Sequence, residues 1–138
     1  MTITGSGVVL SRCDPARPRE VRRFLAAAHH VHEHCFPESR WVAPLTSEVR
    51  HYLDPAKNPL FGHATVALWV ASLRGRVVGS IAAVDDADWR LHQRRDGGSF
   101  GFFECVDSPA LAAELLGAAA DWLRRAKRKV VLAGHEVF

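Results

Sequence analysis

The chain has 138 residues, 48% of them hydrophobic and 24% charged, a globular composition that excludes a disordered chain, a collagen-like repeat or a long coiled coil. Its formal charge of +3 suits an anionic small molecule at least as well as nucleic acid. The longest apolar run, 64–73, is too short to cross a bilayer, and no basic residue precedes the short apolar run near the N-terminus. The three cysteines are too widely spaced for a disulfide framework or a Cys-x-x-Cys metal site. We therefore expect a cytoplasmic protein that does not bind membranes.

The first part of the chain predicts a strand followed by two helices. A short strand is expected at 7–12. Apolar residues three and four positions apart then predict an amphipathic helix over 18–35. After a connector at 40–45, a shorter helix is expected at 46–53. The prolines, asparagine and glycine of 54–62 predict a loop.

The clearest strand pattern lies in the middle of the chain. Two apolar runs, 64–73 and 76–84, flank Arg74 and Gly75 and predict a β-hairpin. Both faces of the first run are apolar, with Val66, Leu68 and Val70 on one face and Ala67, Trp69 and Ala71 on the other. Because a strand buried on both faces needs cover on both, we expect helices on both sides of the sheet.

The last part of the chain predicts a strand–helix–strand unit. A polar loop at 85–98 precedes a strand at 99–106. Ser108 is a good N-cap and Pro109 a good first residue for the Leu- and Ala-rich helix that follows. A final strand is expected at 129–133 and should run parallel to the earlier one.

The predicted order is therefore β-α-α-β-β-β-α-β. In open α/β sheets, ligands bind at the carboxyl ends of parallel strands, beside the N-terminus of the connecting helix. In this chain that place falls at 103–108, which the topology makes the candidate site.

Six segments follow one another along the chain: WVAPL (41–45), LDPAKNPLFGHA (53–64), VALWVA (66–71), GRVVGSIAAV (75–84), FGFFECVDSP (100–109) and DWLRRA (121–126). In this order they resemble a bacterial subfamily of the GNAT-like acyl-CoA N-acyltransferases with the motifs WVPPL, LDPxKNPFFxHA and FFGFFExxDD. The likeness covers roughly residues 20–133. It implies an α/β (α+β) GNAT-like fold, a mixed central sheet with helices on both faces. The whole chain would be one domain that stops before the family's C-terminal helix and two strands.

The resemblance also implies a reaction, the direct transfer of an acyl group from acetyl-CoA or another acyl-CoA to an amine of a small molecule or peptide. Glu104 would be the general base, and backbone N–H groups near Cys105 and Val106 would polarise the carbonyl. The residues expected around the cofactor are Phe103, Cys105, Val106, Asp107 and Ser108. Trp89 and His92 are candidate substrate contacts, although Trp89 could equally belong to a partner surface. Cys105 has no histidine beside it in sequence, so we expect it to pack as a small apolar side chain rather than act as a nucleophile.

The chain departs from the family where the cofactor phosphates would bind. GNAT proteins usually carry a Gly-rich loop there, whereas 104–109 contains neither Gly nor Arg. Pro109 removes an N–H donor, and Asp107 would repel a phosphate. In addition, Ser80 stands where the subfamily has an arginine. These differences support a second hypothesis, a non-catalytic GNAT-like module whose final strand pairs with a second copy or a partner protein.

Two further patterns indicate surface chemistry rather than a site. In the HHVHEHC segment (29–35), His32 falls on the apolar face of the helix, while His30 and His34 lie together on the opposite face. A histidine pair alone lacks the third and fourth ligands of a zinc site, so we expect no metal. The basic segment 124–129 suits the C-terminal end of a helix dipole, and without interleaved aromatic residues it does not predict nucleic-acid binding.

Overall fold

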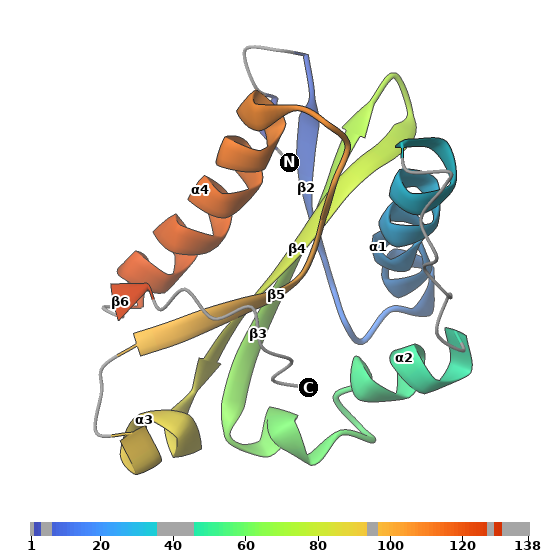
Figure 1. Cartoon of the computed structure of the whole chain (residues 1–138). Helices are drawn as coiled ribbons and strands as arrows, with labels where there is room; N and C mark the ends of the chain where they lie inside the picture. Colours follow the sequence, from blue (N-terminus) through green and yellow to red (C-terminus); the bar gives the residue numbers. More distant parts are fainter. Residues whose placement is uncertain (1, 4–6, 36–45, 94–96, 127–128, 131–138) are drawn as a thin grey trace.

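The computed structural model describes residues 2–3, 7–35, 46–93, 97–126 and 129–130, and Figure 1 shows their arrangement. Six strands form one sheet whose spatial order is the order of the chain. They are β1 (Thr2–Ile3), β2 (Val9–Cys13), β3 (Ala64–Leu73), β4 (Arg76–Asp86), β5 (Gly97–Cys105) and β6 (Lys129–Val130). Neighbouring strands are antiparallel except β5 and β6, which are parallel. The mixed sheet and its parallel pair are therefore confirmed, while β1 was not expected.

Helices cover both faces of this sheet, as predicted. In Figure 1, α4 crosses one face, and α1 lies on the other with α2 beside its N-terminal end. The helical segments are α1 (Pro18–His30), the π-helical turn η1 (Val31–Cys35), α2 (Thr46–Tyr52), the 3₁₀ turn η2 (Pro59–Gly62), α3 (Ala87–Gln93) and α4 (Pro109–Arg125). At the start of α4, the Ser108 side chain accepts a hydrogen bond from the Leu111 N–H, which is the expected N-cap.

The predicted hairpin is formed by β3 and β4. Arg74 and Gly75 join the strands with φ values of 52° and 80°, the left-handed pair that a two-residue turn of type I′ requires. The two faces of β3 enter two different hydrophobic clusters, as the double apolar pattern predicted. The α4 cluster contains Val8, Leu10, Ala67, Trp69, Ala71, Val78, Ile81, Ala83, Leu111, Leu115, Ala119 and Leu123. The α1 cluster contains Cys13, Val21, Phe24, Val49, Leu53, Leu60, Val66, Leu68, Val70, Ala82 and Val84.

The predicted loop at 85–98 is wrong in part. Strand β4 continues to Asp86, helix α3 occupies Ala87–Gln93, and β5 begins at Gly97. The physical reason lies in Asp86, whose carboxylate accepts the N–H of Asp88 at 3.0 Å and so caps the first turn of α3.

The other differences are smaller. The regular part of the first helix ends at His30 and continues as a π-helical turn, and the loop at 54–62 contains a 3₁₀ turn whose Leu60 N–H is capped by Asn58. The predicted connector at 40–45 lies outside the described residues, as does most of the predicted last strand.

Candidate functional site

Strand β5 carries an extra residue where it passes Ser80 on β4. Glu104 pairs with Ser80 and Gly101 pairs with Ala82, so two residues of β5 stand opposite the single residue Ile81. Such a β-bulge bends the strand and changes the face on which the following side chains lie. One of the two bulge residues, Phe102, has a backbone φ of 49°, which is uncommon for an aromatic residue.

Contacts from two neighbouring elements hold this bulge. The buried Ser80 hydroxyl donates a hydrogen bond to the Phe102 carbonyl at 2.9 Å. The Phe102 ring meets Phe24 of α1 edge-on, with centroids 5.9 Å apart. Phe102 is therefore fixed from β4 and from α1, and the strained backbone is supported by its surroundings.

The bulge decides which face of the sheet Glu104 occupies. Before it, Phe100 packs against the α4 cluster, whereas Phe102 packs against the α1 cluster. Residues two apart in a regular strand lie on the same face. These two phenylalanines lie on opposite faces because the bulge adds a residue between them. With a regular ladder Glu104 would stand opposite Gly79, beneath α4. With the bulge it lies on the α1 side.

There Glu104 meets His32. The Nε2 atom of His32 lies 3.1 Å from Oε2 of Glu104, and the side chains are 22% and 25% exposed. His32 belongs to η1, directly after α1, so two residues 72 positions apart form a partly buried polar pair. The sequence placed His32 on the apolar face of its helix, but nothing in the sequence indicated this partner.

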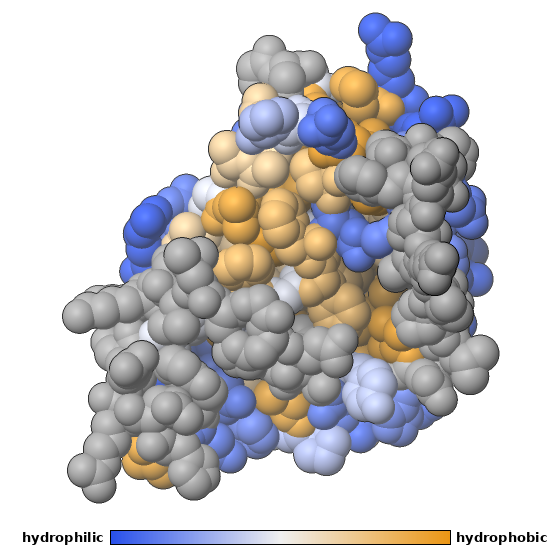
Figure 2. All heavy atoms as spheres, viewed as in Figure 1, coloured by the Kyte–Doolittle hydropathy of each residue, from blue (hydrophilic) through white to orange (hydrophobic). Residues whose placement is uncertain are grey.

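Two other predicted site residues of β5, Cys105 and Phe103, contact residues on the α4 side of the sheet. Cys105 packs against the α4 cluster, and its Sγ atom lies 3.9 Å from the Ser108 carbonyl oxygen. Phe103 is 37% exposed and meets Phe100 edge-on. Figure 2 shows apolar residues gathered over this part of the molecule, between α4 and α1. Cys105 is therefore placed as a packing residue, on the side of the strand away from His32.

The backbone after β5 is largely occupied by its own hydrogen bonds. The Val106 N–H donates to the Val78 carbonyl at 3.1 Å, so this donor is engaged within the sheet, and the predicted role of Val106 stays a prediction. The Ser108 N–H donates to the Val106 carbonyl, and the N–H groups of Leu111 and Ala112 donate to Ser108. Asp107 is exposed nearby. This helix start offers phosphates fewer N–H donors than a Gly-rich loop would.

Trp89 and His92 are not brought to Glu104. Both lie in α3, which begins seven residues beyond Ser80 along β4, a distance of roughly 20 Å in a strand. Their side chains lie outside the described part of the structure, so their substrate role stays a prediction. The sequence could not reveal this separation, because it depends on β4 continuing to Asp86.

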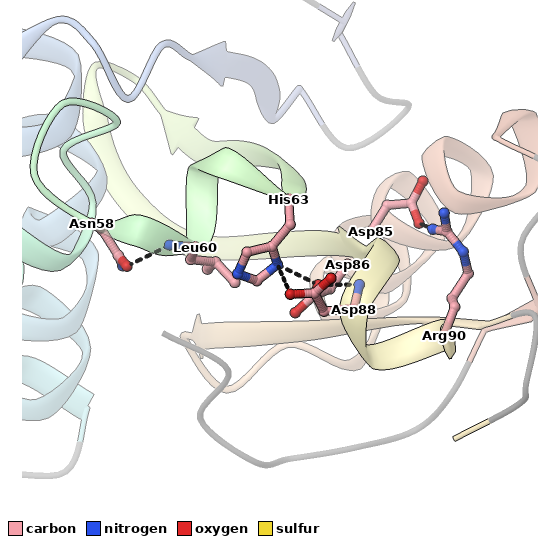
Figure 3. Close-up of polar contacts among 7 residues, drawn as sticks. All are labelled: Asn58, Leu60, His63, Asp85, Asp86, Asp88 and Arg90. Atoms are coloured by element: carbon pink, nitrogen blue, oxygen red, sulfur yellow. Dashed lines mark hydrogen bonds and ion pairs between the residues drawn. The ribbon is translucent and has the colours of Figure 1, made fainter. Parts of the chain in front are cut away.

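A second polar cluster fixes α3 to the end of the hairpin, as Figure 3 shows. The Nδ1 atom of His63 lies 2.7 Å from Asp86 and 3.6 Å from Asp88, and Arg90 pairs with Asp85. The hydrogen bond to Asp86 raises the pKa of His63 above its ordinary value of 6.5. This cluster is placed to hold α3 rather than to meet Glu104.

Four other features of the described residues bear on function. They include no group of three or more His, Cys, Asp or Glu side chains that could hold a metal ion, and no helix among them is long and apolar enough to cross a membrane. A cavity of about 240 Å³ lies between the start of α1 and the end of α2, where Arg50 and Lys57 stand beside Asp54. Burial raises the pKa of the Cys13 thiol to about 11, which makes it a poor nucleophile.

Solved structures that are similar to the chain include acetyltransferases. It superposes on a tandem GNAT protein of the clavulanic acid pathway with a TM-score of 0.64 and 15% identity, over 88% of this chain and 34% of that one. For a ribosomal-protein-alanine N-acetyltransferase from Brucella melitensis biovar Abortus 2308, the TM-score is 0.61 and the identity 16%, over 94% and 82% of the chains. The chain therefore has the GNAT fold, as predicted.

Two curated bacterial proteins are similar in sequence. A bacterial ceramide synthase of Caulobacter vibrioides is 37% identical over 108 residues, which are 78% of this chain and 27% of that protein. Protein YghO of Escherichia coli is 38% identical over 87 residues, 63% of this chain and 22% of that protein. The chain thus spans about a quarter of the length of these relatives. No family profile matches it.

Proposed function

We propose that this chain is an acyl-CoA-dependent N-acyltransferase domain in which Glu104 is the general base. The observation that carries the proposal is the bulge in β5, which turns a carboxylate toward the α1 side of a GNAT fold and sets it against His32. Bulges that aim a side chain are common beside active sites.

The chemistry needs such a base because an ammonium ion has no lone pair with which to attack a thioester. Glu104 takes one proton from the substrate ammonium. The amine nitrogen then bonds to the thioester carbonyl carbon, and the carbon–sulfur bond breaks. The second N–H proton ends on the departing thiolate, so the products are an amide and a free thiol. A well-placed general base contributes about 10²- to 10⁴-fold to such a reaction.

Sequence similarity narrows the substrate class within this proposal. A ceramide is the amide of a fatty acid and a long-chain amino alcohol, so its formation is an N-acyl transfer. The likeness to a bacterial ceramide synthase therefore favours a long-chain acyl donor and an amino-alcohol acceptor. The partly exposed phenylalanines of β5, Phe100 and Phe103, are compatible with an apolar acyl chain nearby.

The test is a search for amide products by mass spectrometry. The 138-residue chain is incubated with acetyl-CoA or palmitoyl-CoA and one of three amines: sphinganine, a peptide with an N-terminal alanine, or an aminoglycoside. We expect amide with the long-chain pair and a loss of about 100-fold or more in Glu104→Gln. Wild-type protein that yields no amide with any pair, and shows no thermal shift with either acyl-CoA, would refute the proposal.

One observation favours the second candidate function, a non-catalytic module that pairs through its final strand. The hydrogen bonds of Val106 and Ser108 leave little backbone for a phosphate group at the start of α4. Under this alternative the chain does not turn over acyl-CoA and forms a homodimer, or binds a partner protein, along β6. Light scattering across a hundredfold concentration range tests the self-association. A monomer throughout, together with amide formation, would exclude this alternative.

A further inference from the structure

We propose that His32 is a positioning residue for Glu104, a role that rests on the proposed N-acyltransferase function. The two side chains meet at 3.1 Å between Nε2 and Oε2 across 72 residues of sequence. Each keeps only about a quarter of its surface exposed, so water competes less for their hydrogen bond than at an open surface.

The fold holds His32 in place from the helix side. Its neighbour Val31 is 2% exposed, which anchors the turn η1 against the sheet. Earlier in the same helical segment, Phe24 of α1 contacts Phe102 in the bulge of β5. The same helix therefore fixes the bulge with Phe24 and reaches the carboxylate beyond it with His32.

The chemistry of the pair explains what His32 would contribute. A carboxylate accepts hydrogen bonds, so the imidazole donates its Nε2–H to Oε2 of Glu104. With Oε2 held by this hydrogen bond, the carboxylate adopts fewer orientations, and Oε1 remains as the oxygen that accepts a proton. A fixed orientation of the carboxylate speeds proton transfer from a bound amine, because the accepting oxygen must lie within hydrogen-bond distance of the proton.

Two substitutions separate positioning by a hydrogen bond from simple packing. His32→Leu fills the space without a donor, while His32→Gln keeps an N–H group near the position of Nε2. We expect His32→Leu to lower kcat about 10- to 100-fold, with the KM for acyl-CoA within about twofold of wild type. His32→Gln should retain kcat within about threefold. The matched controls are His51→Leu and His51→Gln at an exposed histidine of α2, and both should match wild type.

The same substitutions in the Glu104→Gln background complete the test. If His32 acts through Glu104, His32→Leu lowers kcat no further once the carboxylate is gone. The proposal is overturned if His32→Leu leaves kcat unchanged, if His32→Gln loses as much as His32→Leu, or if the loss persists in the Glu104→Gln background. Wild-type protein that forms no amide instead refutes the proposed function itself, so the two failures are distinguishable.

A spectroscopic measurement covers the case in which His32→Leu does not fold. In ¹⁵N-labelled protein, Glu104→Gln should move the imidazole nitrogen resonances of His32 and leave those of His51 in place. Unchanged His32 resonances would overturn the contact on which the role depends.

Discussion

The two helices that cover the sheet meet it through different side chains. Under α4 the sheet presents Gly79 and Gly98, and a Cβ atom at either would collide with the leucines of the helix, so α4 lies close to the strand backbones. Under α1 the sheet presents the side chains of Val66, Leu68 and Val70, and the contact ends in the polar pair of His32 and Glu104. The face under α4 is therefore stabilised by close apolar packing. The face under α1 includes a polar pair whose groups can transfer or hold a proton.

Removing a leucine from the α4 face should give the largest loss of stability. Leu115 is fully buried, so Leu115→Ala should lower the free energy of unfolding by about 2–5 kcal/mol, measured by urea denaturation. Leu116→Ala, at the partly buried next position, should cost about 1 kcal/mol. If the faces divide as described, kcat per folded molecule stays unchanged in both variants. A fall in kcat for Leu115→Ala would show that the faces are not separate.

Adding a methyl group between α4 and the sheet tests the close approach. The Cβ of Gly79→Ala would lie 2.8 Å from Leu115 Cδ1 and 3.0 Å from the Glu104 carbonyl oxygen, so we expect a loss of about 1–3 kcal/mol. The control is Gly117→Ala within α4, where nothing lies within 4 Å of the new Cβ. There the better helix propensity of alanine should add about 0.5–1 kcal/mol. Changes of the same sign at both glycines would contradict the packing described.

On the α1 face, Ser80→Ala removes the hydrogen bond that holds the bulge. The Phe102 carbonyl loses its buried donor, which should cost about 1–2 kcal/mol and also lower kcat, because the bulge aims Glu104. Ser72→Ala is the matched control at another buried serine, whose partner Arg23 is exposed and can turn to solvent. Its cost should be smaller, with kcat unchanged. If Ser80→Ala keeps the wild-type kcat, the hydrogen bond that holds the bulge is not needed for activity.

The smallest effect is expected at His63, in the cluster that fixes α3 away from both helices. Because Asp86 raises the pKa of His63, the folded state holds the proton more tightly than the unfolded chain. The resulting stabilisation is complete below about pH 6.5 and is lost as the pH rises through the raised value. Thermal unfolding of wild type and His63→Gln should differ more at about pH 5.5 than at about pH 8.5. If the difference in thermal stability between the two proteins does not depend on pH, the raised pKa of His63 does not contribute to stability.

Most of the fold could be predicted because its signals are local. The turn at Arg74 and Gly75, the cap at Ser108 and the alternation along β3 each depend on a few adjacent residues. Helix α3 was missed although Asp86 was a capping signal, because its polar sequence lacks the apolar stripe of an amphipathic helix.

The candidate site was predictable only in part. Topology and family resemblance selected Glu104, but its direction depends on one extra residue in β5 that leaves no periodic mark in FGFFEC (100–105). His32 was recognised as inward-facing from the helical pattern, yet a pair 72 residues apart has no local signal. The roles expected of Trp89 and Val106 depended on the lengths of β4 and β5 and on their ladder, which sequence patterns define poorly.

The order of the strands has a consequence for how the chain folds. Each strand pairs with its nearest strand in the chain, and the link between β3 and β4 is only two residues long. Closing short links costs little entropy, so the hairpin can form early and the sheet can grow outward from it. During synthesis, each new strand of this segment would pair with a strand that has already been synthesised. We expect the crossover through α4, which joins the parallel pair, to be the slow step.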